Sequence, residues 1–112
     1  MSQASDGANG FRQRAEELLR SVVRRLDAFD PDELEADHVE GVVRVTFADG
    51  SICILNRQSA ADQMWLAEGA SAWHFEWDAS QLAWLDTKGR GDLRDVLTEV
   101  ISRRLGREVS LR

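Results

Sequence analysis

Cysteine is almost absent from this chain of 112 residues, which contains Cys53 alone. A single cysteine allows neither a disulfide within the chain nor a cysteine metal cluster. Its place in the apolar run of residues 52–55 indicates a packed, unreactive thiol. The chain also lacks an apolar run of membrane-spanning length, and residues 1–10 lack the basic start and apolar stretch of a secretory signal. We therefore expect a reduced, cytoplasmic protein.

Basic residues are fewer than acidic ones in this chain. The chain has 14 Lys and Arg against 20 Asp and Glu, which gives a formal net charge of -6 at pH 7. An acidic chain is repelled by phosphate backbones and by anionic membrane surfaces, so we expect neither nucleic acid nor a membrane as a partner. Cations and basic protein surfaces are favoured instead.

Catalytic motifs are missing as well. The sequence has no Ser-His-Asp signature, no HExxH and no glycine-rich phosphate loop. Of its two histidines, His74 lies between Trp73 and Phe75 and is best explained as a structural side chain with a hydrogen-bond partner. His38 follows several acids and is a candidate metal ligand, although a single histidine near acids is the whole basis for this assignment. We assign no catalytic residue and do not expect an enzyme.

The residues that are present describe one domain. Residues 1–10 are small and polar, and we expect them to be disordered, with residues 11–112 forming a single domain. Apolar residues at helical spacing predict a helix that starts near Phe11 and ends at Pro31. A second helix is predicted after the N-cap Asp92.

About six short strands are predicted between the helices, because apolar and polar residues alternate there between turn signals. The strands are residues 34–39, 43–47, 51–55, 63–67, 73–77 and 82–86. Tight turns between them make an antiparallel sheet. Each helix has one apolar stripe, so both should cover the same face of that sheet. The predicted fold is α+β, a two-layer sandwich whose other sheet face is at least partly open.

The segment around Trp65 is a candidate binding surface. A polar elbow, residues 56–59, is predicted to precede the fourth strand. If Met64 and Leu66 point into the core, Trp65 points out of the opposite face, beside the amide and guanidinium groups of the elbow. An exposed indole in such surroundings is a common protein-binding anchor. A sheet covered on both faces would instead make Trp65 a core residue, and the spacing leaves both interpretations open.

A second candidate site is an acidic run without Lys or Arg. It contains Asp27, Asp30, Asp32, Glu33, Glu35, Asp37 and Glu40. Carboxylates are hard ligands that suit ferric iron and bind ferrous iron moderately. No EF-hand spacing fixes a coordination geometry, so we expect shallow, exchangeable, partly hydrated sites. The alternative, which the residues alone favour, is a solvated acidic edge that protects an edge strand and aids solubility.

The motif N-R-Q at residues 56–58, followed by Q-x-W-L-A at residues 63–67, resembles the central signature of the frataxin family. The bacterial branch, the CyaY proteins, is the nearer match. The resemblance covers roughly residues 11–105. A helix with an acidic end precedes the motif, and an aromatic strand, a strand with Trp84 and a terminal helix follow it, in the order found in the family. The resemblance implies the two-layer sandwich fold of that family.

The resemblance also implies a role in iron–sulfur cluster assembly. It implies weak, exchangeable binding of Fe²⁺ and Fe³⁺ by an acidic ridge, and docking of the chain, which we expect to be monomeric, on a cysteine desulfurase and its scaffold protein. It assigns docking to Asn56, Gln58 and Trp65, with Trp84 nearby. For iron we assign six acids: Asp27, Asp30, Asp32, Glu33, Glu35 and Asp37.

The sequence departs from the family pattern at the end of the first helix. Bacterial members usually carry a glutamate pair where Val23 and Arg24 stand, and Arg25 adds a further positive charge. The helical part of the ridge is therefore thinned. This supports an alternative function, a metal-independent interaction module of the same fold. An iron-oxidising enzyme ranks last, because no buried, preorganised site is evident.

Overall fold

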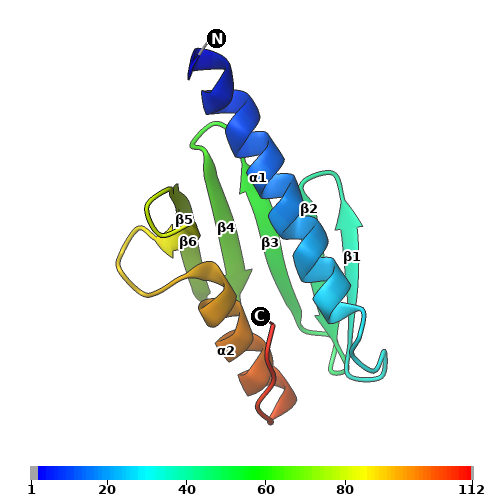
Figure 1. Cartoon of the computed structure of the whole chain (residues 1–112). Coiled ribbons are helices and arrows are strands. Elements are labelled where there is room, and N and C mark those ends of the chain that lie inside the picture. The colour runs from blue at the N-terminus through cyan, green and yellow to red at the C-terminus, as the bar shows by residue number, and fades with distance from the viewer. Residues whose placement is uncertain (1–2, 112) are drawn as a thin grey trace.

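The computed structural model describes residues 3–111, with side chains from Gly10 onward, as two helices and a six-stranded sheet (Figure 1). The elements are α1 (Gln3–Leu26), β1 (Leu34–Val39), β2 (Val42–Phe47), β3 (Ile52–Gln58), β4 (Gln63–Glu68), β5 (Ser71–Asp78), β6 (Ala83–Asp86) and α2 (Leu93–Leu105). The strands lie in the order β1-β2-β3-β4-β5-β6, and each neighbouring pair is antiparallel. The predicted α+β two-layer sandwich is confirmed.

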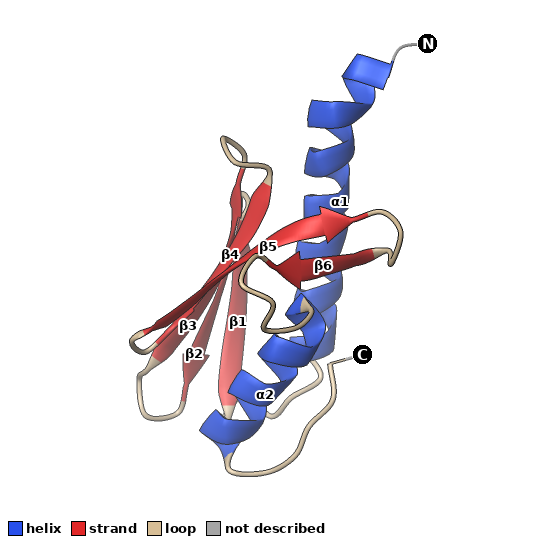
Figure 2. Cartoon of the chain, turned by 90° about the vertical axis from the view of Figure 1, so that its left-hand side faces the viewer, coloured by secondary structure: helices blue, strands red, loops and turns tan. Residues whose placement is uncertain are grey.

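Both helices cover the same face of the sheet (Figure 2). Their apolar stripes and the inward positions of the strands form one buried cluster, because association removes both surfaces from water. Its largest fully buried side chains include Leu19, Leu26, Leu55, Met64, Leu66, Phe75, Leu97 and Ile101. Neither described helix is long and apolar enough to cross a membrane. Neither of the two described helices covers the opposite face of the sheet.

Helix α2 has the predicted N-cap and ends at a glycine. The Asp92 carboxylate accepts a hydrogen bond from the Asp95 backbone N–H at 2.9 Å and so caps the first turn. Gly106 adopts φ 71°, and its N–H donates to the Ser102 carbonyl at 2.9 Å. That left-handed conformation strains most residues but not glycine, which explains why the helix ends there.

The first helix differs from the prediction at both ends. It begins at Gln3, inside the segment of residues 1–10 that was expected to be disordered, whereas Met1 and Ser2 lie outside the described residues. Once a packed helix exists, further turns need no new nucleus, so a polar extension can continue it. The helix ends at Leu26, ahead of Pro31, and this early turn lets Phe29 pack against the core.

The predicted polar elbow is also different, because residues 56–58 belong to β3. Asn56 pairs with Trp65, and Gln58 pairs with Gln63. Outward-facing polar side chains do not interrupt a strand when one sheet face meets water. Arg57 lies on the helix side, where its guanidinium pairs with the Glu16 carboxylate of α1. The chain turns only after Gln58.

Asp86, at the end of β6, is a buried carboxylate held by several donors. Arg90 donates from Nε at 2.9 Å and from Nη2 at 3.1 Å, and the backbone N–H groups of Lys88 and Arg90 add bonds of 3.1 and 3.0 Å. The Arg90 side-chain hydrogen bond is the main reason that the pKa of Asp86 lies below its usual range. The carboxylate thereby fixes the loop between β6 and α2.

We expect Asp86→Asn to lower the free energy of unfolding at pH 7 by about 2 kcal/mol, because it removes a charged acceptor from these bonds. The folded-state pKa of Asp86 is depressed, so its stabilisation is fully present above the unfolded pKa of about 3.9 and is lost as pH falls through the folded-state value. The mutant deficit should therefore shrink as pH falls from about 4 toward about 2. Urea denaturation across that range measures it, with exposed Asp62→Asn as control. A deficit independent of pH would contradict the electrostatic cause.

Candidate functional site

Trp65 lies on the open face of the sheet. Its neighbours Met64 and Leu66 are buried, at 0% and 1% exposure, and Trp65 on the opposite face is half-buried. The predicted assignment of faces is confirmed. The indole stacks on the imidazole of His74, with ring centroids 4.2 Å apart and planes 9° apart. Its Nε1–H donates to the Gln63 side-chain oxygen at 2.8 Å, so both the ring plane and the indole edge are held in place.

The strand register extends this site across the sheet as one row of outward side chains. The row, which we call the docking row, consists of Val39, Val42, Asn56, Trp65 and His74. Val39 is 70% exposed, so the row contains a solvent-facing apolar end as well as the indole. Sequence reasoning found Asn56 and Trp65 but missed the valines and His74. Their membership depends on the pairing of different strands, which spacing within one strand does not reveal.

Gln58 lies in the neighbouring row, opposite Gln63. The Gln63 amide donates to the Glu76 carboxylate at 2.8 Å while its oxygen accepts from Trp65. A series of hydrogen-bonded polar side chains therefore lies beside the indole. Asn56, Gln58 and Trp65 are thus brought together on one face, as predicted.

Trp84 does not join this face, and its predicted place nearby is wrong. It is buried on the helix side, where its ring meets those of Phe11 and Trp77 at centroid distances of 5.9 and 5.6 Å. The pairing of Trp77 with Trp84, and of core residue Phe75 with Asp86, sets the inward face of β6. Cys53 is also internal: burial raises the pKa of its thiol to about 12, so the thiol stays protonated and unreactive.

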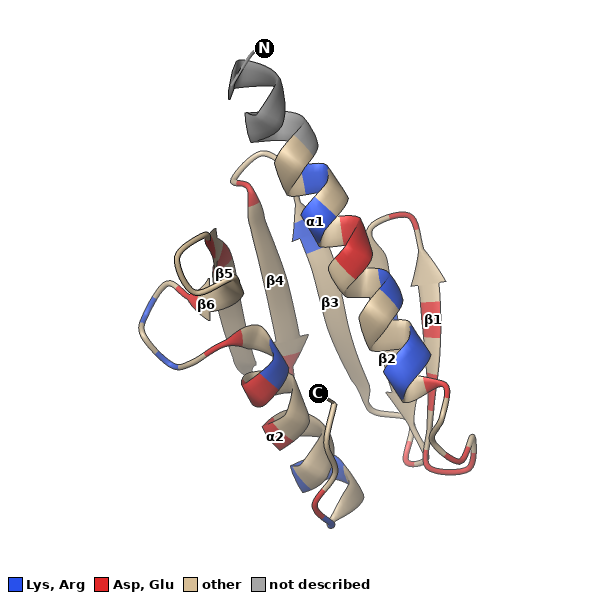
Figure 3. Cartoon of the chain, viewed as in Figure 1, with Lys and Arg blue, Asp and Glu red and all other residues tan. Residues whose placement is uncertain are grey.

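Three of the six predicted metal ligands line one hollow between the end of α1 and β1. The hollow, which we call the acidic hollow, has a volume of about 380 Å³. Its acidic residues are Asp27 directly after α1 and Glu35 and Asp37 from the edge strand β1, where the register directs the last two toward the open side of the sheet. Within the described residues, none of these three carboxylates has a hydrogen bond or an ion pair, and all three side chains are exposed. Figure 3 shows the negative charge of β1 and the preceding loop beside the mixed charges of α1.

The other three acids are placed differently. Glu33 accepts from Arg107 at 2.8 and 3.1 Å, and this bond lowers the pKa of Glu33. Asp30 accepts from the Asp32 backbone N–H at 2.9 Å and therefore stabilises the turn before β1. Asp30 and Glu33 also line a separate hollow together with Arg24, Arg25 and Arg107. The sequence did not predict that the acids separate into two groups, because Arg107 lies 74 residues from Glu33.

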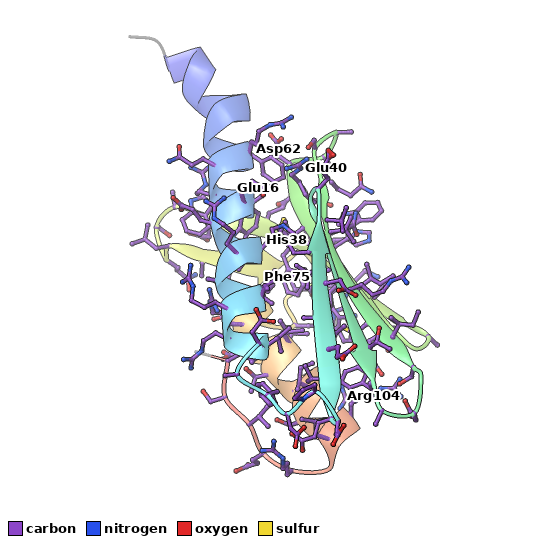
Figure 4. All side chains as sticks on the ribbon, turned by 90° about the vertical axis from the view of Figure 1, so that its right-hand side faces the viewer. Glu16, His38, Glu40, Asp62, Phe75 and Arg104 are labelled. Atoms are coloured by element: carbon purple, nitrogen blue, oxygen red, sulfur yellow. The ribbon has the colours of Figure 1, made fainter. Side chains whose placement is uncertain are left out.

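The acidic hollow suits a hydrated cation better than a tightly held one. Within residues 3–111, no three His, Cys, Asp or Glu side chains lie close enough to form a ready metal site. Hard, exposed carboxylates can share a cation with water at little structural cost. His38 does not line this hollow. Its Nε2 lies 3.9 Å from Oε1 of Glu16, in the space between β1 and α1 (Figure 4).

Known proteins resemble this chain over most of its length. The model of the frataxin-like domain matches residues 5–107. The iron-sulfur cluster assembly protein CyaY of Thioalkalivibrio sulfidiphilus is 39% identical over 102 residues, which span 90% of this chain and 95% of that protein. The protein of the same name from Dechloromonas aromatica is 34% identical over 102 residues, spanning 91% and 95%. The solved frataxin of Psychromonas ingrahamii superposes with a TM-score of 0.83 at 19% identity, covering 94% of this chain and 97% of that one.

Proposed function

Because the chain belongs to the frataxin family, we propose that it is an accessory protein of iron–sulfur cluster assembly that binds iron weakly and docks on a cysteine desulfurase and its scaffold protein. The names of its CyaY relatives support the pathway. The observation that carries the docking part is the placement of Trp65, fixed and outward, in the middle of an uncovered sheet face. We place the chain with accessory proteins rather than enzymes.

The docking row has the features of a binding anchor. A large aromatic side chain contributes most when it is already held in its bound geometry, because little side-chain entropy is then lost on association. Stacking on His74 and the hydrogen bond to Gln63 hold the Trp65 side chain in one geometry before any partner binds. Asn56 offers amide groups beside the indole, and exposed Val42 extends the apolar contact. A partner surface with an apolar pocket and a polar rim would complement this arrangement.

The charge at the sheet edge also supports docking through the open sheet face. The acids of β1, Glu35 and Asp37, lie at the sheet edge next to the docking row, and the register places them on its open side. A negative edge beside an apolar anchor accelerates encounter with a basic partner and rejects an acidic one. Binding of the desulfurase should therefore weaken as salt is added, since salt screens exposed charges.

Iron is proposed to bind at the acidic hollow. In two-dimensional amide spectra titrated with Fe²⁺ without oxygen, we expect signals near Asp27, Glu35 and Asp37 to broaden first, because their carboxylates are exposed and unpaired within the described residues. Signals near Glu33 should respond later, because Arg107 already occupies that carboxylate. Broadening centred on His74, or spread evenly over the surface, would count against this site.

A matched pair of triple variants tests the hollow further. Asp27→Asn with Glu35→Gln and Asp37→Asn should abolish the early broadening. The control, which removes the same charge elsewhere, is Asp62→Asn with Glu99→Gln and Glu108→Gln, all exposed positions. If both triple variants lose iron equally, net charge and not the acidic hollow attracts the metal.

One structural feature favours the second candidate function, a metal-independent interaction module. Arg24, Arg25 and Arg107 line one hollow together with Asp30 and Glu33, so two of the six acids predicted to bind iron lie among a larger number of positive charges. Arginines beside these acids reduce the negative charge that would attract iron, which is a disadvantage for an iron-binding protein. The titration separates the two functions: the module would bind the desulfurase–scaffold complex equally well with and without Fe²⁺ and show no localised broadening.

A further inference from the structure

A pocket of about 370 Å³ lies where the β5–β6 hairpin meets the two helices. Figure 2 shows this hairpin curling toward α1, on the helix-covered side of the sheet. We call it the hairpin pocket, and the residues that matter most are Arg14, Glu17, Trp77, Leu82, Trp84 and Arg94. Its volume falls within the range of small-molecule sites. None of the docking row residues lines it.

Arg14 is the residue in this pocket that lacks an acceptor. Its Nε is buried without a hydrogen-bond partner, and within the described residues its guanidinium makes neither a hydrogen bond nor an ion pair. Its recorded contact is with the ring of Trp77, whose centroid lies 5.3 Å from Cζ. A buried donor left unpaired is destabilising, and such a group in a folded protein calls for an explanation. A carboxylate matches the guanidinium fork and would supply two acceptors at once.

The other walls restrict what can carry that carboxylate. The indoles of Trp77 and Trp84 and the side chain of Leu82 provide an apolar surface. Leu82 is 74% exposed and adopts φ 53°, a left-handed conformation that closes the β5–β6 turn, as Asp62 at φ 54° closes the β3–β4 turn. An apolar ligand body would cover this side chain, which otherwise remains in water.

The charged neighbours fix the sign and number of ligand charges. Arg94 donates from Nη1 to the Leu111 carbonyl at 3.0 Å and from Nη2 to the Ser21 hydroxyl, so its positive charge is anchored in the wall. The Asp92 carboxylate is engaged as the N-cap of α2. Glu17 lines the same pocket and would repel a second negative charge. The lining thus contains two arginines and two acids, so one carboxylate can pair with Arg14 while a second would meet Glu17 and Asp92.

We propose that the hairpin pocket binds a small monocarboxylate with an apolar body, whose carboxylate pairs with Arg14 and whose hydrocarbon lies against Trp77 and Trp84. This site is separate from the docking row and from the acidic hollow, so it does not depend on the proposed function.

The test uses 3-phenylpropionate as the probe and follows the four indole N–H signals of the intact chain by NMR. We expect saturable shifts at Trp77 and Trp84, whereas Trp65 stays unchanged. The neutral 3-phenylpropanamide, of the same shape, should bind at least about tenfold more weakly, because it cannot form the charged pair with arginine. Phenylsuccinate, with a second carboxylate, should also bind more weakly than the monoacid.

Two variants complete the experiment. Arg14→Met keeps the length of the side chain, removes the guanidinium and should weaken the probe at least about tenfold. Arg12→Met, at an exposed position on the same helix, should leave its affinity unchanged. Absence of saturable shifts, equal affinities for acid and amide, or unchanged binding by folded Arg14→Met would each overturn the proposal. The acid and amide comparison uses the wild-type chain and stands even if Arg14→Met does not fold.

Discussion

Replacing Met64 or Leu66 by alanine should lower the free energy of unfolding by about 2–5 kcal/mol, whereas Trp65→Ala should lower it by only about 1 kcal/mol. Met64 and Leu66 are enclosed between the sheet and the helices, so truncation leaves a cavity that its neighbours cannot fill completely. Trp65 lies between them in sequence but on the other face. Its removal forfeits the stacking on His74 and one hydrogen bond, and water fills the vacated space.

Denaturant unfolding of the three variants measures this contrast directly. Equal denaturant dependence among them would show that the midpoints report stability and not a changed unfolded state. Ala67→Gly, at an exposed position of the same strand, serves as a control for the backbone. A loss for Trp65→Ala as large as that for Leu66→Ala would mean that the indole is a core residue and that the open face is covered.

The binding of partners should respond in the opposite order. We expect Trp65→Ala to weaken association with the desulfurase–scaffold complex by roughly 2 kcal/mol or more, about thirtyfold in affinity. Asn56→Ala and Gln58→Ala should weaken it by smaller steps, because each removes a hydrogen-bonding group at the edge of the anchor and leaves the indole in place.

Leu82→Ala is the matched control for this experiment, since it removes an exposed apolar side chain from the turn between β5 and β6, outside the docking row. Isothermal titration of each folded variant into the complex gives the affinities. Weakening by Leu82→Ala to the same degree as by Trp65→Ala would contradict a specific docking row. Unchanged binding by Trp65→Ala would move the interface elsewhere on the molecule.

Much of the fold was predictable because its signals are local. The alternation of Met64, Trp65 and Leu66 defines two faces whatever the strand pairs with, and Asp92 caps its helix through a neighbour three residues away. The extent of β3 was not predictable in the same way. Polar residues 56–58 suggest a loop, and only the pairing with β4 and the charge of Glu16 opposite Arg57 make a strand of them.

The candidate site was harder to predict, because it depends on residues that are remote in sequence. Seven acids in one run suggest one ridge, yet the arginine that binds Glu33 comes from beyond α2. Trp84 looks equivalent to Trp65 as an isolated aromatic in a short strand. The register of β6 against β5 decides that it faces the helices.

The most direct test of docking through the open sheet face is amide and side-chain NMR of the labelled chain as unlabelled desulfurase–scaffold complex is added. We predict that signals of Val42, Asn56, Trp65 and His74 broaden first, together with those of the β1 edge, while the outer surfaces of α1 and α2 change last. Broadening that begins on the helices and spares Trp65, or spectra that do not change at all, would contradict the account.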